Sequence, residues 1–83
     1  MAHFAQIKDD LVLDVIVVSN SDCNDLPFPE SEPVGQAFIA SLGLEGTWLQ
    51  TSYSGSFRGC YAGLGYSFDV IANVFVPPPP AEI

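Results

Sequence analysis

The chain has 83 residues, of which 48% are hydrophobic and 14% charged, and its net charge is -8. A chain of this length forms one small domain, which buries only about 60% of its unfolded surface. The basic side chains are Lys8 and Arg58. Because nucleic-acid phosphates are bound by clusters of such residues, this composition argues against direct nucleic-acid binding.

The amino terminus reads MAHFAQIKDD and predicts no signal peptide, because no basic region is followed by a long apolar run. The longest apolar run, 15–18, is too short to cross a bilayer, so no membrane association is expected. The low fraction of charged residues has two interpretations: a partner covers part of the surface, or the chain is a compact β domain with a large core. The acidic charge favours solubility, or docking on a basic surface.

Two strands joined by a tight turn are predicted at the start of the chain. Residues 2–7 alternate weakly, and 11–18 (LVLDVIVV) have the β-branched composition and length of a strand. The Lys-Asp-Asp sequence at 8–10 supplies turn chemistry, because aspartate tolerates the left-handed conformation. Asp14 indicates that one face of the second strand reaches solvent.

Residues 19–33 are rich in serine, asparagine, aspartate and proline and predict a loop. A helix of about three turns is expected next, with Ser31 or Glu32 as its cap, Pro33 in its first turn and Gly43 just past its end. The positions at helical spacing are Val34, Ala37, Phe38, Ser41 and Leu42.

The second half predicts the rest of the sheet. A strand is expected over 47–53, a turn at 54–56, and one or two strands over 57–69. A turn at 71–73 then precedes a strand at 74–76 that pairs back. The predicted fold class is therefore α+β: a small antiparallel β-sheet of about five strands, in the order hairpin, helix, meander, with one short helix packed on it.

The predicted domain organisation is a single α+β domain over 1–76 followed by a Pro-rich C-terminal arm over 77–83. Pro77 ends strand pairing, because successive prolines lack the N–H donor and adopt polyproline II. The sequence leaves two arrangements of this arm open. It folds onto a neighbour as a semi-rigid segment, or it hangs free.

No catalytic constellation is predicted, and the chain is expected not to be an enzyme. The single histidine, His3, lies near a terminus and is expected at a strand edge. Cys60 has no base nearby in sequence, so its thiol stays mostly protonated. Asp14 is an isolated acid in an apolar strand, which is a weak signal for acid–base catalysis.

No metal site or cofactor is predicted either. His3, Cys23 and Cys60 lack the close pairing of ligands that zinc sites show. The loop SNSDCND offers oxygen ligands, but it lacks the glycine and glutamate of an EF-hand and is expected to be a turn. The two cysteines could form one disulfide, but free thiols are predicted because nothing indicates an oxidising compartment.

Rings alternate with glycines between 48 and 69, and most of these rings are predicted to be core. The glycines at 63 and 65 are too close together for a phosphate-binding fingerprint and do not open a helix. Tyr53, Arg58 and Tyr61 are the best candidates for partner contacts, since tyrosine and arginine are enriched at interface hot spots. The arm adds the interface candidates Pro77, Pro78, Pro79 and Pro80.

The MAHFA start and the run WLQTSYSGSFRGCYAGLGYSFD resemble a family of small proteins encoded by bacteriophages of cyanobacteria. Its members carry a W-x-Q-T-S-Y-x-G-x-F-R core, an A-G-x-G-Y-x-Y/F-D hairpin and an F-x-P-P closing strand. The matching positions are Trp48, Gln50, Thr51, Ser52, Tyr53, Gly55, Phe57, Arg58, Ala62, Gly63, Gly65, Tyr66, Phe68, Asp69, Phe75, Pro77 and Pro78. Relatives continue with another aromatic segment after the prolines, where this chain stops.

The resemblance implies a virion protein, and it carries over no catalytic residues. The leading hypothesis is a capsid cement or decoration protein that binds the major capsid protein or other virion proteins. It would be a homo-oligomer or present in many copies, located in the virion and in the host cytoplasm during assembly. The alternatives are a protein associated with the tail, neck or fibre, and an acidic intracellular phage protein that inhibits a host factor.

Overall fold

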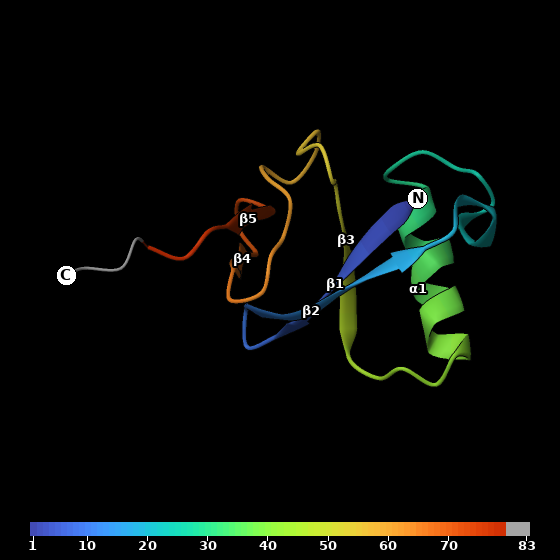
Figure 1. Cartoon of the computed structure of the whole chain (residues 1–83), viewed down its shortest axis with the longest axis horizontal. Helices are drawn as coiled ribbons and strands as arrows, with labels where there is room; N and C mark the ends of the chain where they lie inside the picture. Colours follow the sequence, from blue (N-terminus) through green and yellow to red (C-terminus); the bar gives the residue numbers. More distant parts are fainter. Residues whose placement is uncertain (80–83) are drawn as a thin grey trace.

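The computed structural model describes residues 1–79, which form one five-stranded antiparallel sheet and one α-helix (Figure 1). The elements in chain order are β1 Ala2–Lys8, β2 Leu11–Val18, the 3-10 helix η1 Asn20–Cys23, α1 Ser31–Ser41, β3 Thr47–Thr51, β4 Ser67–Asp69 and β5 Val74–Val76. The strand order in the sheet is β3-β1-β2-β4-β5. The predicted α+β class is confirmed.

The N-terminal hairpin pairs β1 with β2 along the whole of β1. Asp9 and Asp10 form its turn with φ values of 53° and 63°, the two positive values that a two-residue turn needs to match the strand twist. The register shifts between Gln6 and Ile7, which leaves Leu13 as an extra residue in β2. This bulge bends β2 and strengthens its local twist.

The N-cap of α1 lies before both predicted cap residues, Ser31 and Glu32, so the predicted cap is wrong. Glu30 occupies the N-cap position and makes no side-chain capping bond. The Ser31 hydroxyl instead donates to Gln50 Oε1 at 2.7 Å, and Glu32 accepts a hydrogen bond from the Gln50 backbone N–H at 2.7 Å. Both side chains therefore attach the helix to β3 rather than cap it. The predicted end is confirmed, because Gly43 follows the last turn with φ of 81°.

The helical face suggested by the apolar spacing packs only in part, through Phe38, which is half-buried against the core. Ala37, Ser41 and Leu42 are exposed. The buried positions of α1 are Ser31, Gly35 and Ile39. A Cβ atom at Gly35 would lie 2.2 Å from Phe4 Cζ, so the ring of Phe4 occupies the place of a side chain on the helix. Because Gly35 and Ser31 add little hydrophobicity, apolar spacing does not mark this face.

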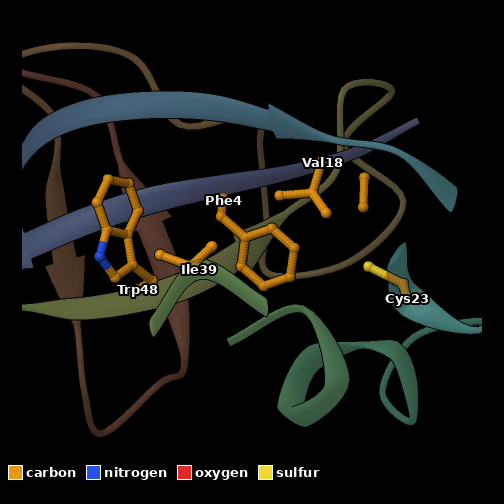
Figure 2. Packing of buried hydrophobic residues seen from close by; sticks show 6 residues of the cluster. Phe4, Val18, Cys23, Ile39 and Trp48 are labelled. Atoms are coloured by element: carbon orange, nitrogen blue, oxygen red, sulfur yellow. The ribbon is translucent and has the colours of Figure 1, made fainter. Parts of the chain in front are cut away.

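One core lies between the sheet and α1. Its buried members are Ala2, Phe4, Val18, Cys23, Ile39 and Trp48. Figure 2 shows Trp48, Ile39, Phe4 and Val18 in a row along the sheet, with Cys23 at one end. Phe4 and Ile39 are fully buried, so this row fixes the helix on the sheet.

A second core lies on the opposite face of the sheet. Its buried members are Ala5, Val12, Ala62, Phe68 and Phe75. It is covered by the β4–β5 hairpin and by the irregular segment 57–66, where the sequence predicted a strand. Arg58, Gly59 and Gly65 have positive φ in or next to this segment, and such a backbone cannot continue a ladder. Of the predicted strand segment 57–69, only β4 is a strand.

Both cysteines are free thiols, as predicted. Cys23 is buried in the core beneath α1, and Cys60 Sγ donates to the Phe75 carbonyl at 3.3 Å. Burial raises the pKa of the Cys23 thiol, and the nearby charge of Asp22 raises it further. A protonated thiol is a poor nucleophile, so Cys23 acts as a small apolar side chain.

Candidate functional site

The tyrosines predicted as contacts come together with His3 at one end of the sheet. Strand β1 places His3 opposite Thr51, the last residue of β3, and Tyr53 follows two residues later. The Ala62 backbone N–H donates to Thr51 Oγ1 at 2.9 Å, which brings the returning chain and Tyr61 back to the same place. We call His3, Tyr53 and Tyr61 the aromatic cluster.

The three rings of the aromatic cluster contact one another. The His3 and Tyr53 rings are stacked, with centroids 5.5 Å apart and an interplanar angle of 18°. Tyr61 meets both rings edge to face, with centroids 5.5 Å from His3 and 5.2 Å from Tyr53. Tyr53 is 74% exposed, whereas the other two are half-buried. The cluster therefore presents a supported, accessible tyrosine ring to solvent.

A serine-rich turn holds Tyr53 in this position. Ser52 Oγ accepts a hydrogen bond from the Ser56 backbone N–H at 3.0 Å and lies 2.9 Å from Ser56 Oγ and 3.2 Å from Ser54 Oγ. Gly55, with φ of 73°, donates its backbone N–H to the Ser52 carbonyl at 2.9 Å. Because Ser52 is buried, the turn is anchored and Tyr53 is directed outward.

An open groove of about 330 Å³ lies beside the aromatic cluster. Its lining residues are Met1, Ala2, His3, Gln50, Thr51, Ser52, Tyr53, Ser54 and Phe57. Phe57 is itself stacked on Phe28, with ring centroids 3.8 Å apart. The groove therefore combines ring surfaces with serine hydroxyls, a composition suited to an apolar segment with exposed carbonyl groups.

His3 was not predicted as a site residue, and no local signal in the sequence identifies it. Its place depends on the register between β1 and β3, which brings residues 48 positions apart side by side. Burial lowers the pKa of His3, and the positive charge of the amino terminus lowers it further. At neutral pH the imidazole is therefore uncharged, which suits stacking on Tyr53.

Arg58, predicted as a contact residue, is held inside the fold. Its guanidinium forms a two-pronged ion pair with the Glu32 carboxylate, and the side chains are 9% and 16% exposed, respectively. It also donates to Asn73 Oδ1 at 3.1 Å and lies 5.2 Å from the centroid of the Phe28 ring. Little of this side chain remains for a partner to contact.

The Arg58–Glu32 pair closes the outer edge of β3. Arg58 donates to the Gln50 carbonyl at 2.9 Å, and Glu32 accepts from the N–H of the same residue. Gln36 Nε2 donates to the Trp48 carbonyl at 2.6 Å. These side chains occupy backbone groups that would otherwise pair with another strand.

The arm begins where β5 ends. Pro77, Pro78 and Pro79 are exposed, and in Figure 1 the chain leaves the β4–β5 hairpin on the side away from α1 and the N-terminus. Pro80, the fourth predicted contact, lies outside the described residues. The candidate residues thus divide between the aromatic cluster, the interior and the arm.

Fold and site together define a small α+β domain with an aromatic groove and a projecting proline arm. Comparison with known proteins adds no relative: no family model, curated protein or solved structure matches the chain significantly. Within residues 1–79, no group of three or more His, Cys, Asp or Glu side chains could hold a metal ion. No helix in this range is long and apolar enough to span a membrane.

Proposed function

We propose that this chain is a non-enzymatic structural protein of a bacteriophage particle, and that it acts as a cement or decoration protein on the capsid shell. The observation that carries the proposal is the pair of exposed contact elements: the aromatic cluster, which lies beside the amino terminus, and the proline arm, which leaves the domain on the side away from the amino terminus. The resemblance of residues 48–69 to a cyanophage protein family supplies the context.

The physical argument rests on how a small domain can join larger neighbours. Two contact elements on different sides can engage two adjacent neighbours at once, either shell subunits or other copies of this chain, and each contact then raises the effective concentration for the other. The net charge of -8 favours docking on a basic surface. A cement protein binds the assembled shell and stabilises it by this linkage.

The test is quantitative mass spectrometry of purified particles of the phage that encodes this chain. We expect the protein in the particle at a copy number comparable to that of the major capsid protein. A much lower copy number would favour the tail, neck or fibre. Absence from the particle would reject both virion roles and favour the intracellular inhibitor.

A second measurement separates cement from passive decoration. Particles assembled without this protein should release their DNA at a lower temperature than complete particles do, and adding the purified protein back should restore the difference. An unchanged release temperature would reject the cement role and leave decoration alone.

A further inference from the structure

We infer that the groove beside the aromatic cluster binds the proline segment Pro77–Pro79 of a second copy of this chain. Consecutive prolines adopt polyproline II, a stiff conformation with no backbone N–H donors and with solvated carbonyl groups. Such segments dock in aromatic-lined grooves, where little conformational entropy is lost. The chain therefore carries both a proline ligand and a groove of the matching chemistry.

The groove meets the requirements of a proline segment in shape and in polarity. The exposed ring of Tyr53 and the ring of Phe57 supply apolar surfaces for the proline rings. Ser54 is exposed in the same lining and, with the Tyr53 hydroxyl, provides donors for prolyl carbonyls. At about 330 Å³, the groove is near the lower end of ligand sites, a size that suits a short segment.

The arm of the same chain points the wrong way to fill this groove. It leaves β5 on the side opposite the N-terminus, and Met1 to His3 form part of the groove lining (Figure 1). Each proline ring fixes φ, so Pro77–Pro79 cannot turn back on itself as a flexible segment would. The accessible groove for this segment is therefore that of a neighbouring copy.

The charge distribution indicates which part of a second copy can approach the groove most easily, namely the arm. Two bodies with a net charge of -8 repel each other, whereas Pro77–Pro79 carry no charge. The groove lies next to the positive amino terminus at Met1. This positive charge offsets part of the repulsion where the arm approaches the groove.

A contact of this kind is heterologous, because it joins the arm of one copy to the groove of the next. Such contacts build rings or open chains rather than closed two-fold dimers. The contact is a property of the isolated protein and does not depend on a place in a phage particle. Mass spectrometry of particles and self-association in solution therefore test the two proposals separately.

The experiment is sedimentation velocity on the full chain over a range of concentrations. We compare the wild type with a groove variant, Tyr53→Ala, and with an arm variant in which Pro77, Pro78 and Pro79 are all replaced by Ala. Leu64→Ala, at an exposed residue outside the groove lining, is the matched control. We expect wild type and control to self-associate, and each variant to associate at least about tenfold more weakly.

Mixing the two variants gives the decisive result. The groove variant keeps an intact arm and the arm variant keeps an intact groove, so a mixture should form one-to-one dimers that grow no further. Circular dichroism checks that both variants keep the wild-type fold. A wild type that stays monomeric at every concentration, or self-association unaffected by either variant, would overturn the inference.

Discussion

Two open stretches of backbone, the outer edge of β3 and the part of β2 beyond its short pairing with β4, are protected in different ways. The outer edge of β3 is covered by the side chains of Glu32, Gln36 and Arg58, which come from α1 and from the segment after β3. On β2, pairing with β4 is confined to Leu11 and Ser67. Further along β2, the Val15 backbone N–H donates a hydrogen bond to the Asp14 carboxylate.

The difference separates protection that depends on tertiary structure from protection that is local. An open strand edge is a template for pairing with another chain. At β3 the protecting groups come from distant parts of the sequence, so whatever moves α1 also exposes the edge. At β2 the protection consists of the bulge at Leu13 and the charge of Asp14, both within the strand itself.

Arg58→Met should have the largest effect, because it leaves the Glu32 carboxylate without its partner at the β3 edge. We expect the free energy of unfolding to fall by about 3–5 kcal/mol, the usual result of removing one partner of a largely buried pair. Urea denaturation followed by Trp48 fluorescence measures it. The control Lys8→Met removes the other basic side chain at an exposed position and should change stability by less than about 0.5 kcal/mol.

Gly35→Ala should weaken the same edge indirectly by moving the helix that carries Glu32 and Gln36. The new methyl group would meet the fully buried ring of Phe4, and such overpacking costs about 1–3 kcal/mol. Thermal unfolding measures the loss. Phe4→Leu in the same chain should relieve part of it, and failure of the two changes to couple would contradict this packing.

Asp14→Val tests the local protection of β2. We expect a small loss of stability, about 0.5–1 kcal/mol, because only the exposed hydrogen bond to the Val15 N–H disappears. Aggregation should rise strongly with concentration, because Leu11–Val18 becomes an uninterrupted apolar strand. Light scattering records it. Glu45→Val removes an equal charge outside any strand and should aggregate more slowly.

Replacing His3 should change the stability least, because His3 lies on β1, between β3 and β2, and protects neither of these two strands. Its pKa in the folded chain is lower than its ordinary value of 6.5, so protons bind the unfolded chain more tightly. The contribution of His3 to stability is therefore complete above pH 6.5 and decreases as the pH falls below it. Thermal unfolding of wild type and His3→Gln should diverge between pH 7 and pH 5, and parallel curves would contradict this.

Local patterns predicted the regular elements well. Alternation and β-branched residues located the N-terminal hairpin, and turn residues located the return at 71–73 before β5. The segment 57–66 differs from the prediction because its aromatic residues favour strands, whereas Arg58 and Gly59 adopt a positive φ. In this conformation Arg58 contacts α1 and β3, and no local pattern reveals these contacts.

The candidate site was only half predictable. Tyr53 and Tyr61 were expected at the surface from residue type, and the structure places them in one cluster. Arg58 was predicted as a third contact residue, but its side chain is largely buried in the ion pair with Glu32. His3 joins the cluster through strand register, a property of pairing and not of its own sequence neighbourhood.

By itself, the sequence determined the α+β class, the hairpin, the end of α1 and the free state of both thiols, because each depends on nearby residues or on composition. The tertiary structure alone decided which face of α1 packs, how the edge of β3 is closed and where the aromatic groove lies. These features arise from contacts between distant residues, such as Gly35 with Phe4 and Arg58 with Glu32. Their energies depend on distance and burial, which exist only once the chain has folded.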